Sequence, residues 1–395
     1  MKYAVVILDG ASGWPLDEFG GLTSLEAAET PNLDFMAARG MVGMAKNVPD
    51  GMECSSNVAC TSIIGYDPAQ YPIGRGAIEG YSAGVVLEPG QVALRVNLSN
   101  VQDGRMFSYS TDNISSEELS PIVDALKEQL DDDTFTLHKS VGFRAILVVT
   151  GHPEIMECSF HAGHNITGEP IADKYPTGPG SDILTSYMKR ADAILADLEI
   201  NREREASGKL PVNCAWVFWP GMRPDSMEPF SEVYGKSAAM QSGVDLFNGL
   251  AALTSMRRCS FAGITDGPDT DYVACGEGAL EMLEDSDVIF VHIEAPDAEG
   301  HDGNAPGKKA AIEAIDREVL GRLLGYAKRH DLRIMASPDH PTPVASRKHA
   351  HEPVPFVLYG PGIEHNGASR LTEDEARATG LLVSPGHKMM GILLG

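Results

Sequence analysis

The chain has 395 residues, of which 56 are acidic and 31 are basic, so its formal net charge is −25. Nucleic acids and anionic membranes require a basic binding face, and this charge balance argues against both as partners. A small anionic substrate stays compatible with it, because bound metal ions reverse the local field. Apolar residues make up 43% of the chain, a share typical of a globular protein, and the length suffices for two domains.

Cysteine usage and the apolar runs predict a soluble, cytoplasmic enzyme. The six cysteines include no C-x-x-C pair, which favours reduced thiols over a disulfide framework or a zinc site. Only five apolar residues, Ala4 to Leu8, precede Asp9 at the N-terminus, too few for a signal peptide or a membrane span. The sequence leaves the oligomeric state open.

Four apolar runs predict buried strands of an α/β fold. They lie at residues 3–8, 287–297, 332–340 and 353–362. Residues 305–330, between the second and third runs, have helical periodicity with Pro306 near the start. Strands that alternate with helices predict a mostly parallel sheet sandwiched by helices. Ligands of such sheets bind at the carboxyl ends of the strands.

Residues 91–230 have a different texture, with turn-rich polar connections between short elements. The expected elements are short strands within 143–151 and 213–221 and a charged helix around 181–206. We interpret this segment as an inserted, smaller α+β domain that binds substrate. The metal-binding catalytic domain is then built from residues 1–90 and 231–395.

Carboxylates and imidazoles gather at the ends of the predicted strands. Asp297 and His301 lie four residues apart in "APDAEGH", and "SPDH" and "KHAHEPVPF" follow later; the further candidates are Asp9, Asp339, His340, His349 and His351. Each cluster alone is more often a surface pair or a core histidine, and their coincidence at three strand ends is what favours a site. Mixed imidazole and carboxylate ligands suit Mn²⁺ or Zn²⁺. The set is large enough for two ions, which together clamp an in-line displacement at phosphorus or sulfur.

A serine pair opens another segment, "GMECSSNVACTSIIGYDP" at residues 51–68. Ser55 and Ser56 precede an apolar run that predicts a helix ending at Gly65. A serine at such a position is usually a cap that accepts a backbone N–H. The alternative is a nucleophile beside the unpaired N–H groups of the helix start, where a phosphate binds well. The segment by itself leaves both interpretations open.

Taken together, the motifs resemble the archaeal-type cofactor-independent phosphoglycerate mutases of the alkaline phosphatase superfamily. The resemblance also extends to a bacterial branch labelled as homoserine kinases, and it covers nearly the whole chain. The motifs are "GGLTSLEAAETPNLDFMAARG", "IGYDPAQYPIGRGAIEGYSAGV", "HNITG", "EAPDAEGH", "SPDHPTPV" and "HAHEPVPF". The resemblance implies an alkaline-phosphatase-like α/β domain with an inserted substrate domain. It also implies transfer of a phosphoryl group between the 3- and 2-positions of glycerate through a phosphoserine, without bisphosphoglycerate. Two divalent ions are implied, with Mn²⁺ favoured over Zn²⁺, Co²⁺ or Mg²⁺.

The resemblance assigns roles residue by residue. The spacing to Gly65 makes Ser56 the nucleophile and Ser55 its neighbour. His351 occupies a position that is usually small in the family, so we expect it near the surface or behind the ligands. The implied ligands of one ion are Asp9, Ser56, Asp339 and His340, and those of the other are Asp297, His301 and His349.

A substrate carboxylate also needs a cationic partner, and arginine binds such anions bidentately. The resemblance implies substrate-binding roles for Arg75, Arg144 and His164, and more loosely for Arg223. The alternative for each arginine is a surface or interdomain salt bridge.

The segment around the nucleophile departs from the family pattern. Relatives read Pro-Gly-Ser-Asp where this chain has Cys54, Ser55, Ser56 and Asn57, and Cys60 stands where relatives carry histidine or asparagine. The ligand set is intact, so phosphoryl chemistry is expected, while the acceptor is open. The favoured hypothesis is a phosphoglycerate mutase. The alternative enzyme is a related metal-dependent phosphotransferase or phosphatase on another small phosphorylated metabolite, homoserine phosphorylation included. A non-enzymatic relative that only binds a phosphorylated metabolite or metal is the third hypothesis.

Overall fold

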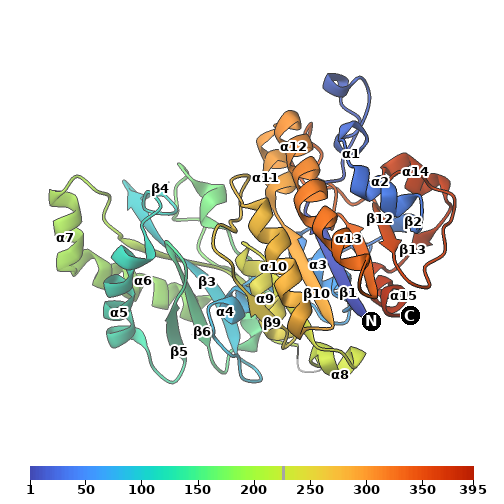
Figure 1. The fold of residues 1–395 in the computed structure, drawn as a ribbon. Helices are drawn as coiled ribbons and strands as arrows, with labels where there is room; N and C mark the ends of the chain where they lie inside the picture. Colours follow the sequence, from blue (N-terminus) through green and yellow to red (C-terminus); the bar gives the residue numbers. More distant parts are fainter. Residues whose placement is uncertain (225–226) are drawn as a thin grey trace. The chain divides into compact units, whose positions relative to one another are not determined.

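The computed structural model describes residues 1–224 and 227–395, and the chain divides into two compact units (Figure 1). The first unit comprises Met1–Pro72 and Ser226–Gly395, and the second comprises Ile73–Asp225. The second unit therefore begins well before residue 91, the boundary expected from the sequence, and it ends before residue 230. The early boundary arises because helix α4 (Arg75–Ser82) packs on two strands of the second unit, β3 (Val92–Gln102) and β7 (Cys214–Gly221).

The first unit is built on an eight-stranded sheet with the order β13-β2-β12-β11-β1-β10-β8-β9. All neighbouring pairs are parallel except those of β12, which runs antiparallel to both β11 and β2. The predicted α/β class with a mostly parallel sheet is confirmed. The strands are β1 (Lys2–Leu8), β2 (Met41–Ala45), β8 (Ala238–Gln241), β9 (Arg257–Cys259), β10 (Val288–Ile293), β11 (Leu332–Ser337), β12 (Val354–Tyr359) and β13 (Leu382–Val383).

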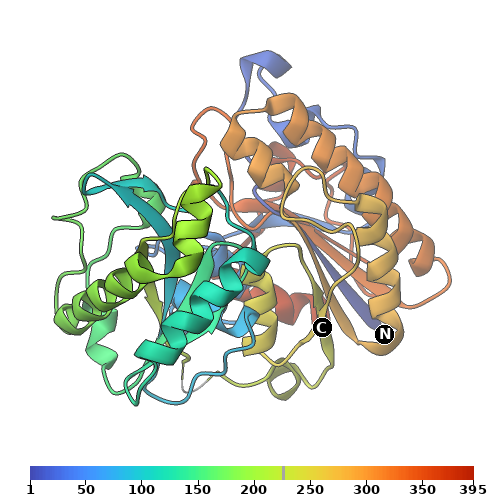
Figure 2. The ribbon, with the colours of Figure 1, turned by 90° about the vertical axis from the view of Figure 1, so that its left-hand side faces the viewer.

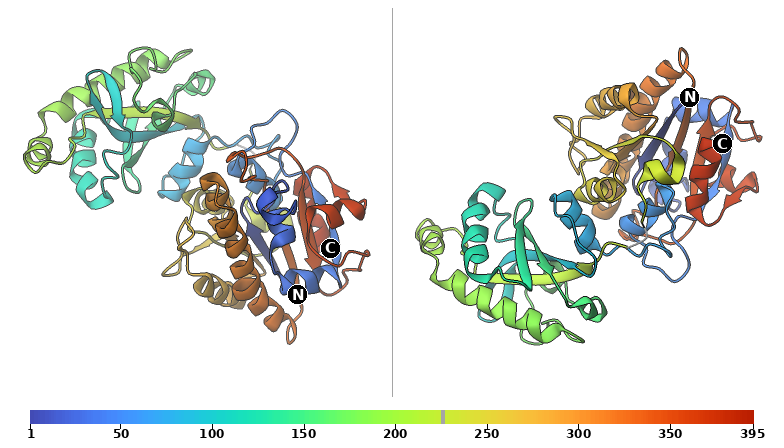
Figure 3. Two further views of the ribbon diagram at one scale, coloured as in Figure 1. Left: turned by 90° about the horizontal axis from the view of Figure 1, so that it is seen from above. Right: turned by 90° about the horizontal axis from the view of Figure 1, so that it is seen from below.

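Helices cover both faces of this sheet (Figure 3), which explains why β1 is apolar at every position from Ala4 to Leu8. Ala4, Val6 and Leu8 pack in a core shared with one group of helices. That group is α2 (Pro31–Ala37), α10 (Tyr272–Asp285), α12 (Ala305–Ile315) and α13 (Gly321–Ala327). Two further helices contact other strands of the sheet, namely α9 (Asp245–Leu253) and α15 (Met389–Leu394), and α3 (Ser56–Ile63) packs against α9. In the described part of the chain, no helix has the length and apolarity needed to cross a bilayer.

The strand directions bring distant segments to one edge of the sheet. β1, β10 and β11 are parallel, so the residues that follow them emerge together. β12 is antiparallel, so the loop that precedes it lies at the same edge. β2 is antiparallel to β12 and therefore points the same way as β11, which delivers the start of α3 there.

The predicted helix at 305–330 is interrupted. It consists of α12, a π-helical turn η4 (Asp316–Leu320) and α13. The Asp316 carboxylate of this turn accepts the backbone N–H of Leu33 at 2.7 Å and of Asn32 at 3.1 Å, which ties it to α2. Another short helix, α11 (Ala295–Asp302), follows β10 directly.

The second unit is an antiparallel sheet centred on β3 (Val92–Gln102), with helices on both faces (Figure 2). Val92, Leu94, Val96 and Leu98 face a core shared with α5 (Ser116–Leu130) and α6 (Ser181–Asp197). The alternate residues of β3 face α4. The predicted charged helix is α6 followed by α7 (Glu199–Ala206). The remaining strands are β4 (Arg105–Ser108), β5 (Phe135–Lys139), β6 (Arg144–Val149) and β7 (Cys214–Gly221).

Asp192 provides a test of the packing of α6 on β7. Its carboxylate accepts the Ala215 N–H at 2.9 Å, while burial raises its pKa to about 6 from 3.8. The native state therefore binds a proton more readily than the unfolded chain, so Asp192 adds stability as the pH falls from about 6 towards 4.

Asp192→Asn keeps the acceptor oxygen and removes the buried charge. We expect it to raise the unfolding free energy at neutral pH by at most about 3 kcal/mol. Urea unfolding at pH about 7.5 and about 4.5 measures this. The advantage of the variant should shrink at the lower pH; an advantage independent of pH would contradict the assignment.

Candidate active site

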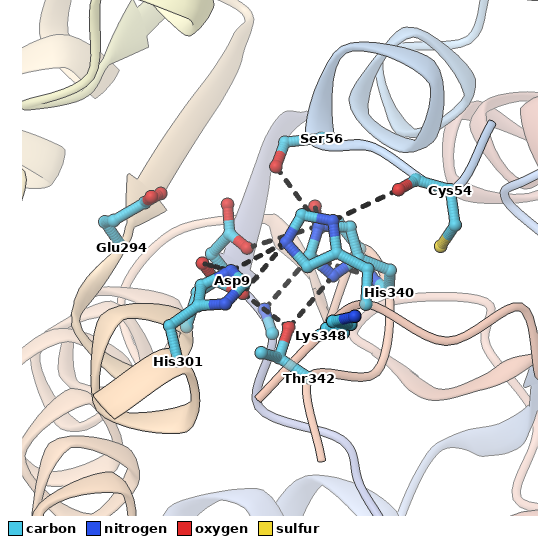
Figure 4. A network of polar contacts seen from close by, with 12 residues as sticks. Asp9, Cys54, Ser56, Glu294, His301, His340, Thr342 and Lys348 are labelled. Carbon is cyan, nitrogen blue, oxygen red and sulfur yellow. Dashed lines mark hydrogen bonds and ion pairs between the residues drawn. The ribbon is translucent and has the colours of Figure 1, made fainter. Parts of the chain in front are cut away.

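The carboxyl edge of the first sheet carries a buried network of carboxylates and imidazoles (Figure 4). Asp339 and His340 follow β11, and both side chains are fully shielded from solvent. Asp339 Oδ1 accepts the backbone N–H of Gly10 at 3.0 Å and of His340 at 2.8 Å. Its Oδ2 lies 3.1 Å from His340 Nε2. Asp9, at the end of β1, lies beside them with its Oδ1 3.8 Å from the same nitrogen.

Ser56 points into this network. It is the first residue of α3, and its Oγ lies 3.1 Å from His340 Nε2. Ser55 occupies the cap position, yet its hydroxyl makes no cap hydrogen bond within the described residues. Ser56 therefore does not act as the cap of this helix. Its hydroxyl lies among potential cation ligands at the positive end of α3.

A second group of ligands adjoins the first. Asp297 lies in the first turn of α11, with its Oδ2 3.2 Å from His301 Nε2 and its Oδ1 3.6 Å from His349 Nε2. The two imidazoles approach each other through their Nε2 atoms at 2.9 Å. His349 also stacks on His340, with ring centroids 3.9 Å apart. The sequence-predicted ligands thus form one continuous cluster.

The cluster concentrates negative charge away from water. Burial, and after it the charge of Asp339, raises the pKa of Asp9 well above its ordinary value. Burial also disfavours the charged form of Asp297, but its hydrogen bond with His301 and the charge of His340 outweigh burial and lower its pKa. That same hydrogen bond raises the pKa of His301 to about 9. A bound cation would relieve this crowding of carboxylates.

The donor atoms fit divalent cations. Asp9 Oδ1 is buried and has no hydrogen-bond partner among residues 1–224 and 227–395. Asp9, Asp339 and His340 present ligand atoms within 4.8 Å of one another, and so do Asp297, His340 and His349. Mixed oxygen and imidazole nitrogen donors suit Mn²⁺ or Zn²⁺. The two implied ligand sets are thus close enough to share His340 as a neighbour.

Two residues of β10 and its exit join this cluster without having been predicted. His292 Nε2 lies 2.7 Å from Asp9 Oδ2, and Glu294 Oε2 lies 3.5 Å from the same nitrogen. Burial, and next the charge of Asp297, raises the pKa of Glu294 to about 8. Together with Asp9 they form a third group of ligand atoms within 4.8 Å. Their only sequence signal is polarity within an apolar strand, in "VIFVHIE".

A buried lysine holds the loops that carry Asp9 and Asp339. Lys308, on α12, donates to the carbonyl oxygens of Gly10 at 2.6 Å, Ser12 at 3.1 Å and Thr342 at 2.6 Å. Burial lowers its pKa to about 8. The ammonium donates to three carbonyls from both loops, so it fixes the loops relative to α12.

The second unit contains a separate cationic cluster on the α4 face of β3. Glu79 Oε1 accepts from Arg75 at 3.0 Å and from the buried Arg95 at 3.2 Å. The Arg75 guanidinium lies over the Trp219 ring, 4.1 Å from its centroid. Trp219 has a φ of 51° at a bulge of β7, a strained conformation of the kind that gathers at functional sites.

His164 and Arg144 extend this cluster. The His164 ring lies 5.4 Å from that of Trp219, and burial together with the charge of Arg95 lowers its pKa. Arg144, on β6, lies opposite Asn97 in the strand register, close to Arg95 on the same strand as Asn97. In the part of the chain that the structure describes, Glu79 pairs with both Arg75 and Arg95, and this gathering of guanidinium groups suits an anionic ligand.

The other two sequence candidates, Arg223 and His351, lie at the surface. Arg223 is exposed. Among the described residues, no stacking contact links it to the cationic cluster around Arg95. His351 is exposed as well. Arg95 was missed by the sequence reasoning, although the alternation of apolar and polar residues in "VALRVNL" marks it as a residue of the opposite strand face.

Comparisons with known proteins agree with the motifs. Residues 37–201 match the family model described as 2,3-bisphosphoglycerate-independent phosphoglycerate mutase. The enzyme of that name from Methanosarcina barkeri is 37% identical, over 100% of this chain and 99% of its own length. A solved structure from Pyrococcus horikoshii matches with a TM-score of 0.83 and 28% identity, over 100% of this chain and 96% of that one. The cofactor-independent phosphoglycerate mutase from Thermoplasma acidophilum matches with a TM-score of 0.68 and 25% identity, over the full length of both chains. The chain therefore belongs to the family of 2,3-bisphosphoglycerate-independent phosphoglycerate mutases.

Proposed function

We propose that this chain is a metal-dependent phosphoglycerate mutase that interconverts 3-phosphoglycerate and 2-phosphoglycerate without bisphosphoglycerate. The observation that carries the proposal is the position of the Ser56 hydroxyl, 3.1 Å from His340 Nε2 inside the ligand cluster. A relative with 37% identity over the whole chain bears the name of this activity. The free thiols of all six cysteines fit a reducing, cytoplasmic compartment.

In this proposal, Ser56 carries the phosphoryl group between the two positions of glycerate. Its Oγ attacks phosphorus, the bond from phosphorus to the 3-oxygen breaks, and that oxygen takes up the proton that the serine loses. In the second half, the 2-hydroxyl attacks the phosphoserine and releases its proton, and Ser56 regains one. Ser56 is the first residue of α3, and the positive end of the helix dipole would stabilise the charge of a phosphoryl group there.

Two divalent cations, with Mn²⁺ the most suitable, would be held by the two ligand sets of the cluster. When bound, they supply Lewis-acid stabilisation of phosphoryl charge and lower the pKa of the serine hydroxyl. The residues in question are Asp9, Ser56, Asp339 and His340 in one set and Asp297, His301 and His349 in the other.

The cationic cluster of the second unit has the chemistry for the substrate carboxylate. Arg75 is half-exposed, and its pairing with Glu79 and stacking on Trp219 fix its guanidinium in one plane. Such a fixed guanidinium loses little side-chain entropy when it binds a carboxylate bidentately. We assign this role to Arg75, with Arg144 and His164 beside it. Arg223 is a weaker candidate, because it is exposed and outside the contacts described for this cluster.

The test is an assay of stripped and reloaded protein. Protein treated with EDTA should be inactive, and Mn²⁺ should restore interconversion of the two phosphoglycerates in the absence of bisphosphoglycerate. Full activity after stripping would rule out the metal assignment. Failure to convert phosphoglycerate, combined with phosphate release from a generic ester or phosphorylation of homoserine, would instead support the related phosphotransferase. The structural basis of that alternative is Cys60, a residue at which this chain departs from the family pattern. Its thiol lies 3.5 Å from Oδ2 of Asp339, one of the proposed metal ligands.

A further inference from the structure

A buried histidine that is absent from the predicted ligand set lies behind Asp9. His292 is 1% exposed, within an otherwise apolar strand. Its ring stacks on Phe247 of α9, with centroids 3.4 Å apart and an interplanar angle of 21°. A buried imidazole is costly unless both ring nitrogens have hydrogen-bond partners.

Both ring nitrogens have partners, and the partners fix the direction of each hydrogen bond. Nδ1 lies 2.8 Å from Ser242 Oγ, and Nε2 lies 2.7 Å from Asp9 Oδ2. The carboxylate of Asp9 accepts, so in the neutral ring Nε2 carries the proton and donates to Asp9. Nδ1 then accepts the hydroxyl hydrogen of Ser242, whose oxygen also accepts the Val244 N–H at 2.9 Å. The chain of donors runs from Val244 through Ser242 and His292 to Asp9.

This series of hydrogen bonds begins at a closely packed turn between β8 and α9. Ser242 is 7% exposed and immediately follows β8. A Cβ at the next residue, Gly243, would lie 2.1 Å from the Thr265 carbonyl oxygen, so the turn packs closely against a neighbouring loop. The hydroxyl that directs His292 is therefore set by backbone packing outside the ligand cluster.

The hydrogen bonds through Ser242 and His292 determine which carboxylate oxygen of Asp9 faces the ligand cluster. Oδ2 is occupied by His292, while Oδ1 has no partner among the described residues and lies 3.8 Å from His340 Nε2. Without the imidazole, the Asp9 side chain would be free to rotate about its terminal bond, since that torsion is soft.

We propose that His292 is a positioning residue for cation binding: with Ser242, it holds the Asp9 carboxylate in the single orientation that presents Oδ1 to the ligand cluster. The proposal concerns the cation site on which the proposed function also rests, but it does not depend on which phosphorylated substrate is used. Partners of this kind behind a metal ligand typically change metal affinity by about 10–100-fold when removed.

The experiment measures Mn²⁺ binding to EDTA-stripped protein by calorimetry, with no substrate present. His292→Met removes both hydrogen bonds and keeps the apolar bulk, and we expect Mn²⁺ affinity to fall about 10–100-fold. His292→Gln, which retains a donor of similar reach, should recover most of the loss. Ser242→Ala removes only the far end of the chain and should weaken binding by several-fold.

A packing control separates positioning from general destabilisation. Phe247→Leu removes the stacking partner and leaves both hydrogen bonds, so it should lower Tm in EDTA while Mn²⁺ affinity stays within about twofold. The proposal is overturned if His292→Met binds Mn²⁺ as the wild type does, or if affinity tracks Tm equally in all four variants. If His292→Met does not fold, Ser242→Ala decides, and unchanged affinity there overturns the proposal. A result in favour of His292 stands even if phosphoglycerate proves not to be the substrate.

Discussion

Replacing Ser56 with alanine will abolish turnover, with kcat falling by at least about a thousandfold, while the fold and the bound metal largely remain. The reason is that, in the proposed mechanism, the serine oxygen receives the phosphoryl group; it is also the hydroxyl of α3 that lies against His340. Steady-state assays give the loss of kcat, and metal analysis of the dialysed variant gives the metal content. Acid quenching of the wild type with substrate, followed by peptide mass spectrometry, should place a phosphate on residues 51–68.

Ser55→Ala is the matched control for this variant. Ser55 is the adjacent hydroxyl, and its closest hydrogen-bond acceptor among the described residues is the Glu53 carbonyl at 3.5 Å. Because Ser55 makes no cap bond in that part of the chain, its removal should leave kcat within a few-fold of the wild type. Residual activity of Ser56→Ala close to that of Ser55→Ala would mean that Ser56 is not the nucleophile.

Asp339→Asn should weaken Mn²⁺ binding by more than about 100-fold and abolish activity at ordinary metal concentrations. The Asn Oδ1 atom preserves the acceptor for the N–H groups of Gly10 and His340, so the loop keeps its local hydrogen bonds. What is lost is the negative charge at the ligand cluster. Calorimetric titration of stripped protein with Mn²⁺ measures the affinity, and excess Mn²⁺ should restore part of the activity.

Asp316→Asn controls for the effect of removing a buried carboxylate. Asp316 is fully buried in the same unit, where it accepts the N–H groups of Leu33 and Asn32 on α2. Its replacement should lower Tm and leave Mn²⁺ affinity unchanged. If both variants lose metal to the same degree, the loss at Asp339 reflects weakened folding and not coordination.

The centre of the first sheet was predictable, because β1, β10, β11 and β12 each read as a mainly apolar run, whereas the short strands β2, β8, β9 and β13 were not predicted. The direction of β12 was not predicted. The segment that connects β11 to β12 is rich in proline and has no helical periodicity, whereas a parallel crossover usually needs a helix of about a dozen residues. That contrast indicates an antiparallel neighbour. The consequence is functional, since only the antiparallel direction delivers His349 to the edge that carries Asp339.

The candidate ligands could be predicted from the sequence because they lie in segments next to strand ends. The residues that hold these ligands in place could not be predicted. Lys308 lies in a helix whose periodicity suggests an ordinary amphipathic face, and nothing in the sequence reveals that its ammonium is buried against three carbonyls. His292 is similarly hidden within an apolar run. Such residues act through contacts across more than 280 positions, as between His292 and Asp9, and local patterns contain no trace of these contacts.

The second unit starts at Ile73, before residue 91, the boundary expected from the sequence. That expectation rested on the turn-rich, polar texture of residues 91–230, which the segment of α4 precedes. In the structure, Gly74 and Gly76 press against the backbone of β7, where a Cβ would lie 2.2 Å from the Pro220 carbonyl oxygen and 2.4 Å from that of Trp219. Helix α4 therefore belongs to the second unit, where its Glu79 accepts a hydrogen bond from Arg95 of the sheet.

Anomalous diffraction from crystals soaked in Mn²⁺ examines the convergence of distant segments most directly. The account predicts two peaks about 3.5–4 Å apart, one among Asp9, Asp339 and His340 and the other among Asp297, His301 and His349, with the hydroxyl of Ser56 directed at the first. Peaks elsewhere on the molecule, or a Ser56 side chain turned away from a correctly occupied pair, would contradict it.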